Sequence, residues 1–95
     1  MRQRARPDLA TPDLVALLDL DEAAFRQRFA GTPMLRAKRR GLLRNVCVAL
    51  GNVGDTQALP ALQKAAADPE PLIAEHAHWA IDRLKARLSG AASVN

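Results

Sequence analysis

The chain has 95 residues, a length that suits one small domain with a single modest core. Apolar residues make up 48% of it and aromatic residues only 3%, and the apolar set is mostly Ala, Leu and Val, which favours close-packed helices over strands. One cysteine excludes an intramolecular disulfide, and no stretch resembles a signal peptide or a membrane span, so we expect a cytoplasmic protein that does not contact a membrane.

Positive charge is concentrated in the first half of the chain. Residues 1–45 contain ten Arg or Lys against five Asp or Glu, whereas residues 46–95 contain four against five. The stretch from Gly31 to Gly54 carries five basic side chains and no acidic one. Such an asymmetry is typical of a protein that meets phosphates or an acidic partner over one surface.

The two ends of the chain lack helical periodicity. Residues 1–10 are basic and predict a flexible arm, and residues 89–95 predict a disordered tail. Residues 11–88 are expected to form one helical domain. Thr11 and Pro12 mark its start, because a hydroxyl can cap free amides and proline at the first helical position loses no hydrogen bond. A short first helix follows.

The second helix has a start signal and a stop signal. Asp21 is its expected N-cap, since a carboxylate there accepts from free amides of the first turn. Phe25 and Phe29 lie four residues apart and would pack together on one face. Gly31 is a good residue to end the helix, because glycine adopts left-handed backbone angles without strain.

Three further helices are expected. Apolar residues recur at helical spacing from Leu35 to Leu50 and predict the third, which ends at the sequence GNVGD. Asp55 can cap the fourth, in which Pro60 lies close enough to the first turn to be tolerated. The sequence DPEP breaks the chain and opens the fifth, over about residues 70–88. The predicted fold class is therefore all-α with about five helices.

An internal repeat indicates how these helices are arranged. Shifting RNVCVALGNV forward by 31 residues lays it on EHAHWAIDRL, so that Val46 meets Ala77 and Leu50 meets Ile81. The repeated unit is helix, turn, helix, turn. Stacked α-helical repeats show this pattern, because each buries its apolar face on its neighbour. We therefore predict a short helical solenoid.

The same residues carry a resemblance to a known family. The stretch ALGNVGDTQALPALQKAAADPEPLIAEHAHWAI resembles the short HEAT-like repeat of phycobilisome lyases. The segments F-x-G-T, R-x-G-x-x-R-N, A-L-G-N and E-H-x-x-W-A-I together resemble the C-terminal region of epoxyqueuosine reductase, the enzyme that completes queuosine in the tRNA anticodon. This resemblance covers about residues 7–84 and implies a short HEAT-like solenoid.

The resemblance also implies a role. In that family the HEAT-like part helps to hold the tRNA anticodon stem and loop, while the catalytic part binds cobalamin and two iron–sulfur clusters through cysteine motifs. The single Cys47 cannot supply those motifs, so we expect no cofactor in this chain. The expected partners are a tRNA anticodon stem-loop and a separate catalytic reductase domain, and we expect a monomer.

The basic stretch supplies the candidate RNA-binding residues. On one continuous helix, Arg36, Arg40 and Arg44 would form a ridge turned away from the apolar stripe. Like charges four residues apart repel by about 0.2–0.5 kcal/mol per pair, and no acid in this stretch relieves them. Phosphate contact would explain the cluster; a solvated face paired with acids on other helices is the alternative. The candidates are Arg36, Lys38, Arg39, Arg40, Arg44, Asn45 and His78.

Other side chains have more ordinary expected roles. Asn45 could read a base edge, although a local hydrogen bond is its alternative, and His78 is a candidate surface contact. We expect Trp79 to pack against the preceding repeat and His76 to be partly buried with a backbone or carboxylate partner. His76 and His78 point about 200° apart on a helix, so they cannot share a metal.

The sequence contains no enzyme signature. Cys47 is interpreted as a small apolar core residue, and no nucleophile has a base nearby. Glu75 and Asp82 share a helix face, but nothing around them predicts a cleft. Gly51 and Gly54 follow a helix and are interpreted as a C-cap and a turn, not as a phosphate loop. We therefore expect no independent catalytic activity.

Two functional hypotheses remain beside each other. The first is tRNA binding by electrostatic capture of backbone phosphates. The second is a protein-interaction scaffold that docks its helical face on an acidic partner or on a catalytic domain, as solenoids commonly do. Salt dependence separates them, because RNA binding weakens steeply as salt rises. A small independent enzyme would instead require a cofactor or metal in the purified protein.

Overall fold

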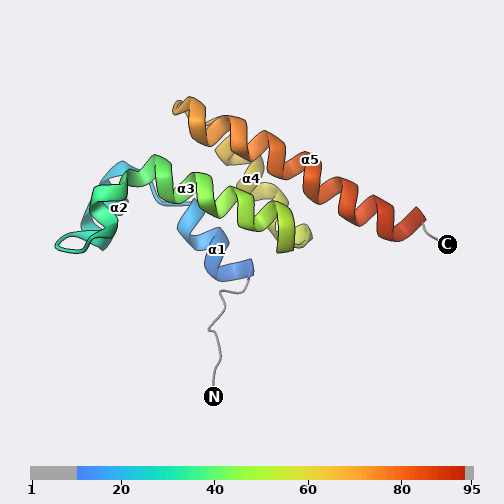
Figure 1. Cartoon of the computed structure of the whole chain (residues 1–95), viewed down its shortest axis with the longest axis horizontal. Helices are drawn as coiled ribbons and strands as arrows, with labels where there is room; N and C mark the ends of the chain where they lie inside the picture. Colours follow the sequence, from blue (N-terminus) through green and yellow to red (C-terminus); the bar gives the residue numbers. More distant parts are fainter. Residues whose placement is uncertain (1–10, 94–95) are drawn as a thin grey trace, which may run out of the picture.

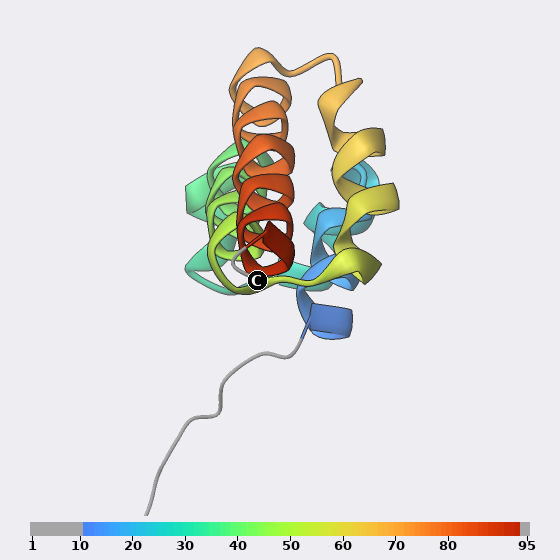
Figure 2. The same cartoon turned by 90° about the vertical axis from the view of Figure 1, so that its right-hand side faces the viewer.

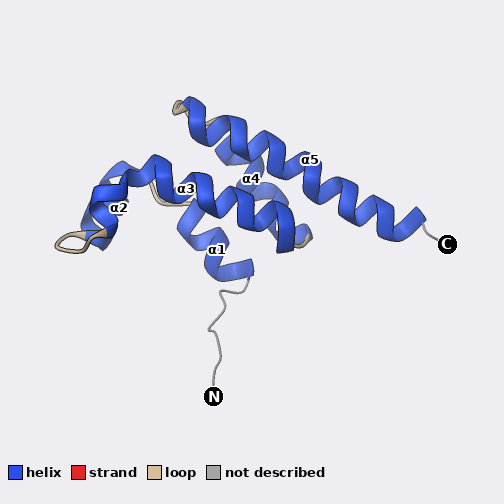
Figure 3. Cartoon of the chain, viewed as in Figure 1, coloured by secondary structure: helices blue, strands red, loops and turns tan. Residues whose placement is uncertain are grey.

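A computed structural model of the chain describes residues 11–93, and the side chains as far as Ser89. The described part is all-α (Figure 3). Its elements in chain order are α1 (Thr11–Leu18), α2 (Glu22–Phe29), α3 (Met34–Val53), the 3-10 turn η2 (Thr56–Ala58), α4 (Leu59–Ala66) and α5 (Pro71–Ser93). The predicted fold class is confirmed, and five α-helices are present in the described residues.

The helices form two layers around one core. α3 and α5 lie side by side in one layer, and α1 and α4 lie in the other (Figure 1 and Figure 2). α2 packs against the start of α3. Burial of one apolar face per helix drives this arrangement. The core consists of Leu14, Leu18, Leu43, Val46, Cys47, Leu50, Ala58, Leu62, Ala65, Ile73, Ala77, Ala80 and Leu84.

The predicted helix ends are largely confirmed. The Ala24 N–H donates to Asp21 Oδ1 at 2.7 Å, so Asp21 caps α2. Gly31, just after α2, has a φ of 77°, the left-handed conformation that favours glycine. Asp55 accepts from the Gln57 N–H at 2.9 Å, but it caps η2, and α4 begins only after that turn.

α3 is not one continuous helix. Lys38 has a φ of 68° and a ψ of 157°, far from helical values, so the first turn of α3 is separated from the rest by a kink. Arg36 precedes the kink, whereas Arg40 and Arg44 follow it. The predicted single ridge of three arginines is therefore wrong for Arg36, because the kink removes the regular rotation between turns on which the ridge depends.

Gly51 allows the close approach of α3 and α5. Gly51 was predicted to be a C-cap, but it is buried inside α3. A Cβ atom at Gly51 would be 2.8 Å from Trp79 Cζ3 and 3.1 Å from Ala80 Cα. Gly54 is the C-cap, and its N–H donates to Leu50 O at 2.9 Å. Only a residue without a side chain fits at Gly51 with this helix spacing.

Arg87 of α5 completes the end of α3. Its Nε donates to Gly51 O at 2.9 Å and its Nη2 to Gly54 O at 2.7 Å. Carbonyl groups in the last turn of a helix have no partner within the helix, and they carry partial negative charge. A half-buried guanidinium therefore joins the two helices of one layer at the end of α3.

The repeat is present, but its register differs from the predicted one by a residue. Buried positions of α3 and α5 correspond when they are taken 30 positions apart, as Leu43 and Ile73 are; Leu50 and Ala80 follow the same rule. Under the predicted shift, the exposed Val53 would match the buried Leu84. In both helices apolar residues also stand next to the buried positions, so the sequence alone does not distinguish one register from the next.

The fifth helix is longer than predicted. α5 continues to Ser93, whereas the predicted fifth helix stopped at Leu88 and left a disordered tail over 89–95. Small residues such as Ala91 and Ala92 are compatible with helix, which explains the extension. The arm predicted for residues 1–10 lies outside the described residues, as do residues 94–95.

Candidate nucleic-acid interface

Two of the candidate arginines lie together on α3. Arg40 and Arg44 are four residues apart, about 6 Å along the axis of the part that follows the kink. Arg40 is exposed and Arg44 is half-buried. Within residues 11–89, neither forms an ion pair with an acidic side chain. Arg44 Nε donates to Asn45 Oδ1 at 3.2 Å, so Asn45 makes the local hydrogen bond that was its alternative role.

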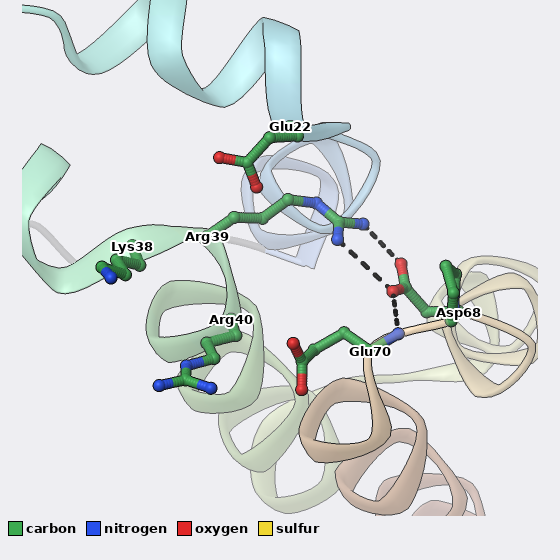
Figure 4. Close-up of a pocket in the computed structure, with 7 residues that line it drawn as sticks. Glu22, Lys38, Arg39, Arg40, Asp68 and Glu70 are labelled. Atoms are coloured by element: carbon green, nitrogen blue, oxygen red, sulfur yellow. Dashed lines mark hydrogen bonds and ion pairs between the residues drawn. The ribbon is translucent and has the colours of Figure 1, made fainter.

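Arg39 follows the alternative interpretation of the basic stretch, because it is paired with an acid from another part of the chain. Its Nε donates to Leu20 O at 2.7 Å, and its guanidinium bonds with both carboxylate oxygens of Asp68 (Figure 4). The exposed fractions of the two side chains are 16% and 11%. Arg39 therefore ties the start of α3 to the α1–α2 and α4–α5 connections, and its charge is already balanced inside the protein.

The environment of Asp68 supports this structural role for the pair. The hydrogen bond from Arg39 holds the pKa of the Asp68 carboxyl below its ordinary value, and the Glu70 N–H, which donates to Asp68 Oδ1 at 2.9 Å, acts in the same direction. Burial of the carboxyl opposes both effects without cancelling them. Asp68 is thus ionised at neutral pH and neutralises Arg39.

The cleft beside this pair has no net charge of either sign. It has a volume of about 480 Å³, and Figure 4 shows basic and acidic side chains around it. Three bases face three acids there, so the cleft does not favour a phosphate over a cation. Its charged lining residues are Glu22, Lys38, Arg39, Arg40, Asp68 and Glu70.

Arg36 and Lys38 lie at the opposite end of α3 from Gly51. Both are exposed. Arg36 borders a shallow cleft of about 570 Å³ formed with the α2–α3 turn around Thr32 and Pro33. Neither residue forms an ion pair with an acidic side chain among the described residues. Arg36 lies before the kink and Lys38 lies at the kink, so both precede Arg40 and Arg44 along α3.

His78 is exposed as predicted, but it is not close to the arginines on the molecular surface. It lies about 200° around α5 from His76, and His76 is on the side that faces α3. The Nδ1 of His76 bonds with Leu72 O at 2.8 Å, which confirms the predicted backbone partner. The structure therefore groups Arg40, Arg44 and Asn45 and leaves His78 on the other side of α5.

A pocket that the sequence reasoning missed lies between α3 and α5. It has a volume of about 410 Å³ and is lined by Val48, Glu75, His76 and Trp79. Trp79 is 43% exposed although it packs on α3 at Gly51, as predicted. The helical spacing of Glu75 and His76 relative to Trp79 was a usable signal, because residues three and four apart share a face. The contribution of Val48 from α3 could not be predicted, because it depends on how α3 and α5 pair.

Cys47 does not fit an iron–sulfur cluster. Its side chain is fully buried in the core, as predicted. Burial raises the pKa of the Cys47 thiol to about 11, and the negative charge of Asp68 adds to the rise. Cluster ligation requires several deprotonated thiolates, so a lone buried thiol offers no site. Among the described residues, no three His, Cys, Asp or Glu side chains gather closely enough to hold a metal ion.

Comparison with known proteins shows which families the sequence is similar to. The model of the PBS lyase HEAT-like repeat family matches residues 44–68. That range covers the end of α3, η2 and α4, which is one helical hairpin of the two-layer arrangement. No solved structure gave a significant match to the chain.

Relatives among curated proteins extend the likeness to most of the chain. An epoxyqueuosine reductase of Xanthomonas campestris pv. campestris is 40% identical over 79 residues, which are 82% of this chain and 22% of that protein. The epoxyqueuosine reductase of Lactococcus garvieae is 38% identical over 80 residues, 83% of this chain and 23% of that protein. The chain is similar to the C-terminal part of epoxyqueuosine reductases.

The similarity covers only a small part of each relative. A third epoxyqueuosine reductase, from Shewanella oneidensis, is 34% identical over 84 residues, 85% of this chain and 21% of that protein. The chain spans about a fifth of the length of these curated epoxyqueuosine reductases. Among the described helices, none is long and apolar enough to cross a membrane.

Proposed function

We propose that the chain is the tRNA-binding module of an epoxyqueuosine reductase and so part of queuosine formation in the tRNA anticodon. The relatives' name and the extent of the match support the pathway. The observation that carries RNA binding is the pair Arg40 and Arg44, which lie one turn apart on α3 without acidic partners among the described residues. The cobalamin and iron–sulfur clusters of such a reductase would be held by residues outside this chain.

The proposed mechanism is electrostatic capture. Arg40 and Arg44 neutralise successive backbone phosphates of the anticodon arm, and Arg36 and Lys38 continue the contact beyond the kink. Each phosphate contact releases condensed counterions, so the logarithm of the binding constant falls with the logarithm of salt concentration, by about 0.7–0.9 per contact. Arg39 does not take part directly; it positions the helix that carries the other two arginines.

A charge-reversal pair tests this function. The Arg40→Glu, Arg44→Glu double variant should bind a labelled tRNA anticodon stem-loop at least about tenfold more weakly at low salt, because two contacts become repulsive. Its salt slope should be smaller by about 1.5. Fluorescence anisotropy of the RNA measures both quantities.

The matched control changes the net charge equally but elsewhere. Arg28→Glu, Lys85→Glu alters one residue of α2 and one of α5, both exposed. It should weaken binding less than about threefold, since no direct phosphate contact is lost. Equal binding by the Arg40, Arg44 variant and the parent would refute the assignment, and equal losses in both variants would reduce it to general attraction.

Exposed apolar side chains favour a second candidate function, docking on a protein. Val53 is 68% exposed at the end of α3, and Leu35 is 38% exposed in its first turn. Such side chains suit a contact with a catalytic reductase domain. Binding of that domain without RNA, with weak salt dependence, would favour this candidate over RNA capture.

A further inference from the structure

The pocket between α3 and α5 combines features that the charge pattern alone does not explain. Its volume of about 410 Å³ is open to solvent, and it is lined by one aromatic ring, one aliphatic side chain, one imidazole and one carboxylate. Val48 is one turn beyond Arg44 on α3, so the pocket adjoins the proposed phosphate-binding arginines. This position suits a ligand with a flat ring that contacts Trp79 and an anionic group that contacts the arginines.

The aromatic wall is held firmly. The six-membered ring of Trp79 lies against the α3 backbone where Gly51 leaves room for it, yet 43% of the residue remains exposed. An indole fixed on one edge and open on the rest is a ready stacking surface that loses little freedom on binding. A nucleobase of any type can stack on such a ring, because every base has an aromatic face.

The polar wall offers acceptors. Leu72 O can only accept a hydrogen bond, so His76 Nδ1 must be the donor in their 2.8 Å contact. In the tautomer that carries its proton on Nδ1, Nε2 is an acceptor. Glu75 is exposed and has no partner among the described residues. A ligand with adjacent N–H donors satisfies this wall, and among the nucleobases guanine supplies two such donors on its Watson–Crick edge.

We propose that this pocket takes one unpaired nucleobase, preferably guanine, from the RNA strand whose phosphates lie on Arg40 and Arg44. This inference rests on the proposed function and deepens it. The base stacks on Trp79 and against Val48, and its N–H groups donate to Glu75. The chain thus distinguishes a looped RNA from a duplex of equal charge, because only unpaired bases can leave the strand and enter a pocket.

Trp79 provides its own readout, since it is the one tryptophan of the chain. Titration of the full 95-residue chain with an anticodon stem-loop should quench its fluorescence saturably. A fully paired RNA with the same number of phosphates should quench it far less. Guanosine monophosphate should also quench, whereas ribose 5-phosphate, which carries the same phosphate without a base, should not.

Variants separate stacking from folding. Trp79→Ala should weaken stem-loop binding about tenfold, and Trp79→Phe should restore most of it, because a phenyl ring keeps a stacking face. Glu75→Gln should abolish the preference for guanosine over adenosine monophosphate, since an amide no longer offers two acceptors. Far-UV circular dichroism and thermal midpoints of all three variants verify that the fold is retained.

The outcomes distinguish this inference from the function on which it rests. If the stem-loop binds but Trp79 fluorescence is unchanged and Trp79→Ala binds equally well, the pocket is not a base site and the phosphate contacts stand alone. If no RNA binds the parent chain, both proposals fail. If a purified catalytic reductase domain quenches the fluorescence of Trp79 and RNA does not, the pocket is a protein-docking surface and the base site is refuted.

Discussion

At the scale of single residues, Arg39 and Asp68 show the largest difference between expected and observed roles. The two side chains are 29 positions apart in sequence, and their carboxylate–guanidinium contact is largely withdrawn from solvent. Charge-assisted hydrogen bonds of this kind are stronger than neutral ones, and removal of one partner leaves the other buried without compensation. Arg39 therefore belongs to the framework of the fold.

Asp68→Asn tests this framework role. The variant leaves the guanidinium without a counter-charge, so it should lower the free energy of unfolding by about 2 kcal/mol at neutral pH. Urea denaturation followed by circular dichroism measures the change. Asp82→Asn, at an exposed position of α5, is the control and should change stability by less than about 0.5 kcal/mol. A neutral outcome for Asp68→Asn would contradict the structural role.

The pH dependence of stability follows from the same carboxyl. Its pKa in the folded chain lies below the ordinary 3.8, so between those two values the unfolded chain binds more protons than the folded chain. The contribution is fully present above 3.8 and is lost as the pH falls through the lower folded value. As the pH falls below about 4, Asp68→Asn should therefore lose less stability than the parent, and denaturation at a series of pH values measures the difference.

At the scale of helices, the contact between α3 and α5 depends on a missing side chain. Gly51 lets the ring of Trp79 and the backbone at Ala80 approach α3. In an ordinary helix, alanine would be better than glycine by about 1 kcal/mol, because glycine loses more backbone freedom on folding. The close approach reverses that preference at this one position.

Gly51→Ala should therefore destabilise the protein by about 1–3 kcal/mol, since the added methyl group meets Ala80 backbone that cannot move away. Gly41→Ala is the matched control in the same helix, where a Cβ atom meets nothing within 4 Å. It should stabilise by about 0.5–1 kcal/mol. Thermal or urea unfolding of both variants measures the difference. Equal effects at the two positions would mean that the helices are farther apart than described.

At the scale of the whole molecule, one core connects both layers. Leu62 of α4 is fully buried between the layers, and Leu50 of α3 and Leu84 of α5 belong to the same cluster. A small domain has a total stability on the order of 5–10 kcal/mol. A loss in one helix should therefore affect all of them, and unfolding should be a single cooperative transition.

Leu62→Ala tests this cooperativity. It should remove about 2–5 kcal/mol, a large share of the total. Far-UV circular dichroism reports on all helices, and Trp79 fluorescence reports on the pocket between α3 and α5. The unfolding curves measured by the two probes should therefore shift together. Leu88→Ala, at a residue that is 36% exposed, should shift neither by more than about 1 kcal/mol. Separate transitions for the two probes would show that the layers unfold independently.

Local chemistry determined much of this protein from sequence. The caps at Asp21 and Asp55, the glycine turn at Gly31 and the apolar periodicity predicted all-α structure, helix number and stacking. These signals act between residues a few positions apart, so they can be read along the chain. The acid-free basic stretch likewise identified the segment that carries Arg40 and Arg44.

Only the tertiary structure decided what each of those residues faces. Arg39 was a candidate RNA-binding residue, but packing of α3 against the α4–α5 connection makes it the partner of Asp68. The kink at Lys38 separates Arg36 from Arg40. The pocket at Trp79 exists because two helices about 30 residues apart approach at Gly51. Contacts between distant residues depend on helix register and spacing, which no local pattern specifies.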